Sequence, residues 1–115
     1  MNVITARDAR EWEAWLEAHH HSESEIWIKI AKKASGVASV QPAEATEVAL
    51  CFGWIDSHRR RGDQTTYFQR YSPRRRGSRW SQLNVAAAER LIESGRMRPA
   101  GFAEFRKRAS PDETG

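Results

Sequence analysis

A chain of 115 residues is long enough for one domain with one apolar core and too short for two independent domains. Hydrophobic residues make up 39% of it and charged residues 30%, and five tryptophans supply material for a core, which excludes a wholly disordered chain. The single cysteine, Cys51, excludes an internal disulfide. The N-terminus lacks the basic and apolar stretches of a secretory signal, so we expect a cytoplasmic protein without a transmembrane segment.

Basic charge is concentrated in one stretch of the chain. Residues 57–79 contain eight arginines against a single acidic residue, Asp63, which gives a local net charge of +7 and leaves −3 for the rest of a chain whose total is +4. Such a stretch attracts phosphate groups by raising their local concentration. Arginine outnumbers lysine fifteen to four in the whole chain, so a general preference for arginine is the competing explanation.

Hydrophobic periodicity predicts a helix and then a strand in the first third of the chain. Thr5 and Asp8 have the spacing of a capping box, which predicts that a helix begins at Ala6. Trp12 and other apolar residues follow at three- and four-residue spacing and form the core face of this helix. Three isoleucines then alternate with other residues, which predicts a strand over residues 25–33.

A second helix and a hairpin are predicted next. Pro42 suits the first turn of a helix, and Gly53 suits the left-handed position that ends one. Residues 54–61 and 65–72 have the composition of two strands, with a turn between them that contains glycine and aspartate. They indicate a β-hairpin.

Two more helices complete the predicted fold. One covers residues 81–94, and a short one begins at Pro99. The order of elements predicts a single α+β domain over residues 1–109, in which a small antiparallel sheet of about three strands packs with three to four helices. Residues 110–115 are expected to be a frayed polar tail.

Several motifs resemble a known bacterial family. In chain order, they are Ala49-Leu50-Cys51-Phe52-Gly53-Trp54-Ile55-Asp56, Pro73-Arg74-Arg75, Ser78 with Trp80-Ser81 and Asn84, and Gly95-Arg96-Met97 with Pro99-Ala100-Gly101. At these positions the chain is similar to the YdeI/OmpD-associated family. The resemblance implies a link to protection against bacteriocins or antimicrobial peptides and to an outer-membrane porin, and it brings no catalytic residue or cofactor. Longer members continue into a C-terminal helical segment that is absent here after Ser110, so a protein partner that supplies this segment is one alternative.

The loop that leads from Arg74 into the third predicted helix is the main candidate site. Guanidinium groups, hydroxyls and the backbone N–H groups of a helix start together suit phosphate or carboxylate recognition. The candidate anion-binding residues are Arg74, Arg75, Arg76, Ser78, Arg79 and Ser81, with Arg59, Arg61, Arg70 and Trp80 as secondary members. The alternative is that these arginines pair with glutamates of neighbouring helices or are solvated.

Aromatic residues of the hairpin extend this hypothesis. Tyr67, Phe68 and Tyr71 are interleaved with Arg70, a composition that can stack bases and hold phosphates. Strand alternation puts the tyrosines on one face and Phe68 on the other, so some of the rings belong to the core. We assign Phe68 to the core.

Asp56 and His58 support an alternative function, a small enzyme. They lie two residues apart on a predicted strand, so they share a face and can form an acid–base pair in a polar pocket. The consecutive histidines 19–21 fan out around a helix axis, and they suit its C-terminal end better than a metal ion. The sequence therefore predicts neither a metal site nor a cofactor.

The leading expectation is a noncatalytic binding module. The chain contains no Gly-rich phosphate loop, paired Cys-x-x-Cys or hydrolase motif. Its basic hairpin and loop suit an anionic partner. An acidic protein, a nucleic acid and a small phosphorylated ligand are the three alternatives.

Overall fold

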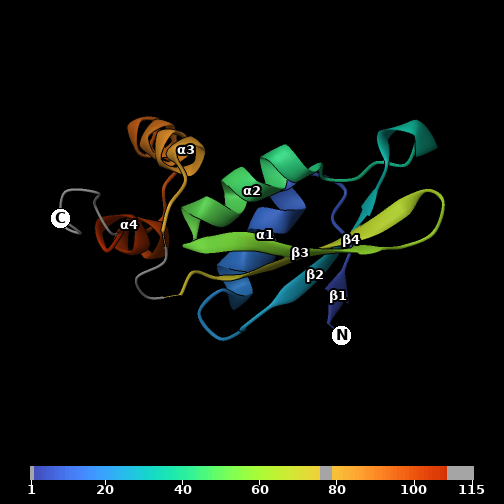
Figure 1. Cartoon of the computed structure of the whole chain (residues 1–115), viewed down its shortest axis with the longest axis horizontal. Coiled ribbons are helices and arrows are strands. Elements are labelled where there is room, and N and C mark those ends of the chain that lie inside the picture. Colours follow the sequence, from blue (N-terminus) through green and yellow to red (C-terminus); the bar gives the residue numbers. More distant parts are fainter. Residues whose placement is uncertain (1, 76–78, 109–115) are drawn as a thin grey trace.

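Four helices and a four-stranded sheet form the part of the chain that the structure, a computed structural model, describes, which is residues 2–75 and 79–108. In chain order, the elements are β1 (Val3–Ile4), α1 (Ala9–His19), β2 (Ile26–Ala31), the short 3-10 helix η1 (Lys33–Ser35), α2 (Pro42–Cys51), β3 (Trp54–Arg61), β4 (Thr66–Pro73), α3 (Gln82–Glu93) and α4 (Pro99–Arg106) (Figure 1). The predicted α+β fold and its hairpin are confirmed.

The strands are arranged in the order β1-β2-β4-β3. Both β2 and β3 pair with β4 in the antiparallel direction, whereas the two-residue strand β1 pairs with β2 in the parallel direction. The sheet is therefore mixed, and it has one strand more than the sequence patterns indicate, because two residues are too few to show an alternation. The pairing of β2 with β4 places the first third of the chain beside the hairpin.

Helices α1 and α2 pack on one face of the sheet (Figure 1). Trp12 of α1 is fully buried, and its ring centroid lies 5.2 Å from that of Tyr71 on β4. The indole N–H of Trp12 donates a hydrogen bond to the backbone carbonyl of Ala45 in α2 at 2.9 Å. The isoleucines of β2 are buried in the same cluster, so the predicted core faces of the first helix and of the first long strand are confirmed.

Local hydrogen bonds decide where the first two helices begin and end. Helix α1 begins at Ala9, because the carboxylate of Asp8 accepts a hydrogen bond from the backbone N–H of Glu11 at 3.0 Å and caps the helix. The predicted start, three residues earlier, is wrong for this reason. Helix α2 begins at Pro42, and Gly53 follows its end with a φ of 76°, both as predicted.

The C-terminal helices lie at one end of the molecule and the turn of the β3–β4 hairpin lies at the other (Figure 1). Helix α3 begins after Ser81, whose hydroxyl oxygen accepts a hydrogen bond from the backbone N–H of Asn84 at 3.1 Å. Helix α4 approaches the end of α2 closely at Gly101, which has no side chain. A Cβ atom at this position would clash with the backbone carbonyls of Leu50 and Cys51. This contact holds α4 against α2 and leaves the hairpin turn on the opposite side.

Candidate functional site

The loop between β4 and α3 does not present all of its predicted anion ligands on the surface. Arg74 is buried, with 6% of its surface exposed, whereas Arg75 and Arg79 are exposed. Arg76 and Ser78 lie outside the described residues. The side chain of Arg74 is therefore packed inside the protein, whereas Arg75 and Arg79 are the loop arginines that an external anion can reach.

Arg74 takes part in the packing between the end of β4 and the C-terminal helices. Its guanidinium carbon lies 3.8 Å from the ring centroid of Trp80, and Trp80 meets the ring of Phe105 edge-on with centroids 5.5 Å apart. Burial lowers the pKa of Arg74 to about 10, while the charges of Asp56 and Glu104 act in the opposite direction. The guanidinium stays charged at neutral pH, so the ring of Trp80 stabilises a buried cation of the chain itself.

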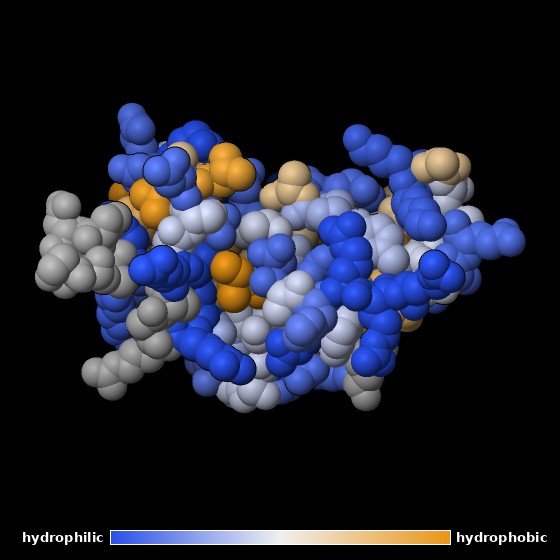
Figure 2. Space-filling view, in the orientation of Figure 1, coloured by the Kyte–Doolittle hydropathy of each residue, from blue (hydrophilic) through white to orange (hydrophobic). Residues whose placement is uncertain are grey.

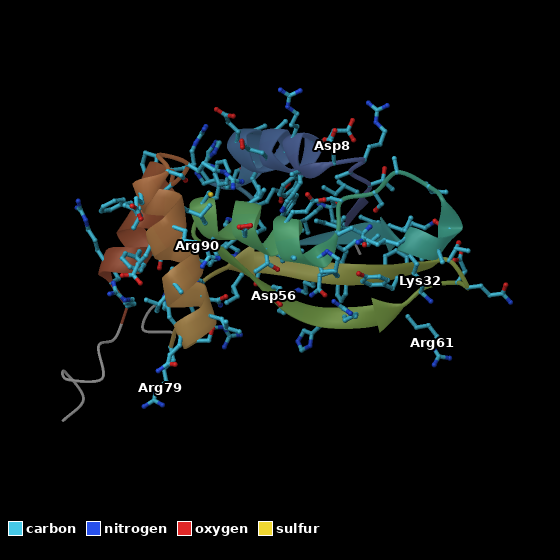
Figure 3. All side chains as sticks on the ribbon, turned by 90° about the horizontal axis from the view of Figure 1, so that it is seen from above. Asp8, Lys32, Asp56, Arg61, Arg79 and Arg90 are labelled. Carbon is cyan, nitrogen blue, oxygen red and sulfur yellow. The ribbon has the colours of Figure 1, made fainter. Side chains whose placement is uncertain are left out.

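The exposed arginines of the hairpin stand at the end of β3. The guanidinium carbon of Arg59 lies 4.7 Å from the ring centroid of Tyr67, and that of Arg60 lies 5.4 Å from the ring of Trp27 on β2. Figure 2 shows hydrophilic side chains gathered over this end of the molecule, and Figure 3 shows Arg61 there, far from α3. Strand β3 therefore ends in three consecutive exposed cations, Arg59, Arg60 and Arg61.

Arg70, a secondary candidate, lies on β4 and bonds to neighbouring strands of the sheet. Its guanidinium donates hydrogen bonds to the carboxylate of Glu25 at 3.3 Å and to the hydroxyl of Ser57 at 3.1 Å. The hydrogen bond from Arg70 lowers the pKa of Glu25 below its usual value. For this arginine, pairing with a glutamate is the arrangement that the structure shows.

The second face of the sheet carries aromatic and cationic side chains in alternation. In the register of the strands, Phe68 of β4 stands between Lys29 of β2 and Arg60 of β3. In the adjacent row, Trp27 of β2 stands opposite Arg70 of β4. Lys29 and Arg60 are exposed and Phe68 is half-buried, so this face reaches solvent, while Trp27 is buried beneath its neighbours.

The sequence patterns do not reveal this face, and they predict one of its members, Phe68, in the core. Tyr67 packs against the core cluster, so its neighbour Phe68 points to the other side of β4, and the core assignment of Phe68 is wrong. A signal was present in β2, where Trp27 and Lys29 alternate with the buried isoleucines. The missing information was the pairing of β2 with β4, which joins segments that are far apart in the sequence.

The two residues of the alternative catalytic site do not converge. Asp56 and His58 are both exposed on β3. The pairing of β3 with β4 shifts in register between Asp56 and Arg59, which interrupts the alternation that would put the two side chains on one face. A general acid–base pair works in a concave site that holds its substrate, so this arrangement does not favour acid–base chemistry by Asp56 and His58.

The histidines at the end of α1 contact the helix and its neighbours. The Nδ1 atom of His20 lies 2.7 Å from the carbonyl oxygen of Leu16, as suits a helix C-terminus. Within residues 2–75 and 79–108, no group of three or more side chains is placed to hold a metal ion. No helix in this described part has the length and apolar character needed to cross a membrane.

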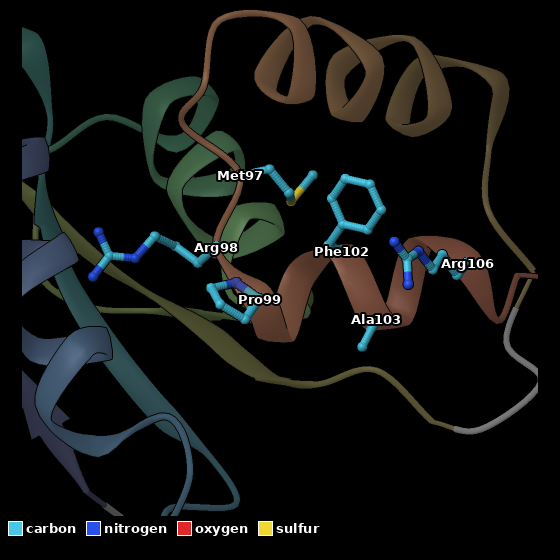
Figure 4. A pocket seen from close by; sticks show the side chains of 6 residues that line it. All are labelled: Met97, Arg98, Pro99, Phe102, Ala103 and Arg106. Atoms are coloured by element: carbon cyan, nitrogen blue, oxygen red, sulfur yellow. The ribbon is translucent and has the colours of Figure 1, made fainter.

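A pocket of about 390 Å³ lies beside α4 (Figure 4). It is lined by Met97, Arg98, Pro99, Phe102, Ala103 and Arg106. One of its two arginines, Arg98, is already neutralised by an ion pair with Glu17, while the guanidinium carbon of Arg106 lies 4.4 Å from the ring centroid of Phe102. The pocket is therefore a weaker candidate for an anionic ligand than the hairpin.

Comparison with known proteins assigns the chain to a family but does not identify an activity. A family model described as a domain of unknown function, DUF8412, matches residues 4–104. No curated protein and no solved structure matches the chain. The resemblance to the YdeI/OmpD-associated family stays a prediction. Since the matched segment covers most of the described fold, including the whole hairpin, the chain belongs to the DUF8412 family of domains of unknown function.

Proposed function

We propose that this protein is a noncatalytic module that binds a polyanionic partner through the β3–β4 hairpin. The observation that carries the proposal is the run of three exposed arginines, Arg59, Arg60 and Arg61, at the end of β3. Alternation along the strand projects Arg59 and Arg61 on one face and Arg60 on the other. Positive charge therefore surrounds the hairpin, which suits a partner with many negative groups.

Two of these guanidinium groups are already held in position. Arg59 is held by the ring of Tyr67 and by a hydrogen bond of 3.0 Å to the side-chain oxygen of Gln69, and Arg60 lies over Trp27. A guanidinium has five N–H donors, and the hydrogen bond to Gln69 uses only one of those of Arg59. Because their side chains are ordered before binding, they lose less entropy when the partner arrives.

The proposed surface differs from the loop that the sequence indicated. Arg75 and Arg79 remain as exposed cations of that loop and add to the positive field. Arg74 is excluded, because it is buried against Trp80. The hairpin, rather than the loop, is therefore the centre of the proposed site.

A role in protection against antimicrobial peptides, which the YdeI/OmpD-associated resemblance implies, stays a prediction. Membrane-active peptides of this kind are rich in lysine and arginine. A basic hairpin repels such peptides, so their direct capture by this surface is not supported by its charge. An anionic partner fits the hairpin better.

The test uses a probe that carries charge alone. A fluorescein-labelled abasic oligomer of about 12 deoxyribose phosphates is titrated with the full chain, and anisotropy is followed at about 50 and about 200 mM salt. The double variant Arg59→Gln/Arg61→Gln is compared with Arg10→Gln/Arg90→Gln, which removes the same charge from exposed positions on α1 and α3.

We expect the hairpin variant to bind the abasic oligomer about tenfold more weakly at the lower salt concentration, and the helix variant to bind within about twofold of the wild type. Equal losses in both variants would show that only net charge matters. That result, or no binding by the wild-type chain at the lower salt concentration, would refute the proposed function.

A further inference from the structure

The face of the sheet opposite α1 and α2 combines flat rings with cations at regular positions. Phe68 is flanked across the sheet by Lys29 and Arg60, and Trp27 is flanked by Arg70. Neighbouring strands lie about 4.8 Å apart, and side chains of one face recur about 6.8 Å apart along a strand. Each ring therefore has a positive group within reach on the adjacent strand.

From this arrangement we infer that the polyanionic partner is single-stranded nucleic acid, whose unpaired bases stack on Phe68 and on the guanidinium of Arg60. Its phosphates contact Lys29 on the same face and, where the strand passes the edge strand β3, Arg59 and Arg61 on the other face. The inference rests on the proposed function and adds the chemical class of the partner. The stacking surface, a second face of the sheet, is separate from the side on which Arg59 and Arg61 project.

Arg60 and Trp27 form a cation–π contact in this surface. Trp27 is only 7% exposed, and the guanidinium of Arg60 lies over its ring. The indole N–H of Trp27 donates a hydrogen bond to Glu25 at 3.0 Å, which fixes the ring beneath the arginine. Arg60 is exposed, so a base can reach its guanidinium from the solvent side, and arginine guanidinium groups stack on unpaired bases in RNA-binding proteins.

The aromatic component separates an unpaired strand from the other polyanions. A duplex offers its phosphates but keeps the faces of its bases stacked inside, so Phe68 gains nothing from it. An acidic protein surface offers carboxylates, for which the flanking arginines suffice and the ring is dispensable. The half-buried ring between two exposed cations has its largest effect on a partner that is both charged and flat.

The experiment compares two probes of equal charge. Labelled oligothymidylate of about 12 nucleotides and the abasic oligomer of the same length are each titrated with the full chain. The test variant is Phe68→Leu, which keeps an apolar side chain and removes the ring. Its matched control is Phe102→Leu, at another half-buried phenylalanine, on α4 at the opposite end of the molecule. Far-UV circular dichroism and urea unfolding verify that both variants fold.

We expect wild-type protein to bind oligothymidylate about tenfold more tightly than the abasic oligomer, because only the oligothymidylate has bases that stack on the ring. Phe68→Leu is expected to lose most of this difference and to bind the abasic oligomer as the wild type does. Phe102→Leu is expected to keep it. A second variant, Arg60→Lys, keeps the charge, removes the planar group and is expected to weaken oligothymidylate binding severalfold.

The other outcomes separate the inference from the function on which it rests. Equal binding of both probes by the wild type would overturn the stacking inference and leave the proposed function standing. Displacement of oligothymidylate by polyglutamate or by a duplex of the same length, at concentrations similar to those of the unlabelled single strand, would also overturn it. If the wild-type chain binds neither probe, the proposed function itself is refuted.

Discussion

The guanidinium of Arg74 stabilises the junction between β4 and the C-terminal helices through the ring of Trp80. The guanidinium carbon and the ring centroid are 3.8 Å apart, and the arginine is 6% exposed. Away from water, a cation over a tryptophan ring contributes about 2 kcal/mol. The aliphatic part of the side chain adds to this by filling space inside the protein.

Replacement of Arg74 by alanine is therefore expected to lower the free energy of unfolding by about 2–4 kcal/mol, because the substitution removes the stacked cation and leaves a cavity. Arg75→Ala, at the next and exposed position, is expected to change it by less than about 0.5 kcal/mol. Urea unfolding followed by circular dichroism measures both. Similar stabilities of the two variants would show that the stacking does not stabilise the fold.

The contrast between these two arginines marks the limit of sequence analysis at the residue scale. Arg74 and Arg75 have the same side chain and adjacent positions, and both were assigned to one anion-binding loop. What separates them is the ring of Trp80, which contacts the guanidinium of Arg74 and packs edge-on against Phe105 of α4. Such packing depends on how distant elements meet, and no local pattern contains it.

At the scale of the element, the turn of the hairpin is fixed by one carboxylate. The Oδ1 atom of Asp63 accepts hydrogen bonds from the backbone N–H groups of Thr65 at 2.9 Å and Thr66 at 2.8 Å. It also accepts hydrogen bonds from the hydroxyls of both threonines. These bonds, led by the one from the backbone of Thr65, lower the pKa of Asp63 to about 2.

This lowered pKa makes the stability of the turn depend on pH. In the unfolded chain the pKa is about 3.9, so the contribution is fully present above about pH 4 and is lost as the pH falls toward about 2. Asp63→Asn is therefore expected to lower the Tm at neutral pH and to leave it near the wild-type value at about pH 2. Glu89→Gln, an exposed change on α3, serves as the control. A Tm difference between Asp63→Asn and wild type that does not change with pH would contradict this account.

Helices of several turns and strands with several alternating residues are predictable from the sequence. The residues at which they begin and end are harder to predict. Helix α2 combines Pro42 at its start with Gly53 after its end, two signals that do not depend on the rest of the fold. The start of α1 was placed wrongly, because Thr5 and Asp8 both suit a cap and only the hydrogen bond to Glu11 decides between them. Strand β1 has no pattern of its own and exists only through its pairing with β2.

At the scale of the whole molecule, the proposed surface exists because β2 lies beside the hairpin. The predicted order of elements was sufficient for the α+β class, but it left the neighbours of each strand undetermined. The pairing of Lys29 with Phe68 and of Trp27 with Arg70 brings side chains of two distant strands together on one face. The sequence could therefore indicate the basic charge of the hairpin, while the aromatic component required the three-dimensional arrangement.

Salt dependence tests whether charge is used locally or only as net charge. For single strands, each neutralised phosphate contributes about 0.7 to the slope of log affinity against log salt concentration. If Arg59 and Arg61 each contact a phosphate, their double replacement by glutamine is expected to reduce the slope by about 1.4, measured with oligothymidylate by anisotropy. Arg10→Gln/Arg90→Gln removes the same net charge at exposed positions on α1 and α3 and is expected to keep the wild-type slope.

The aromatic variant completes this test, because stacking releases no counterions. Phe68→Leu is expected to lower the affinity at every salt concentration and to leave the slope unchanged. Arg59 and Arg61 of β3 would then contribute to the salt-dependent part of the binding free energy. The ring of Phe68 on β4 would contribute to the part that does not depend on salt. If instead Arg10→Gln/Arg90→Gln reduced the slope as much as Arg59→Gln/Arg61→Gln, the hairpin would have no electrostatic role beyond the net charge of the chain.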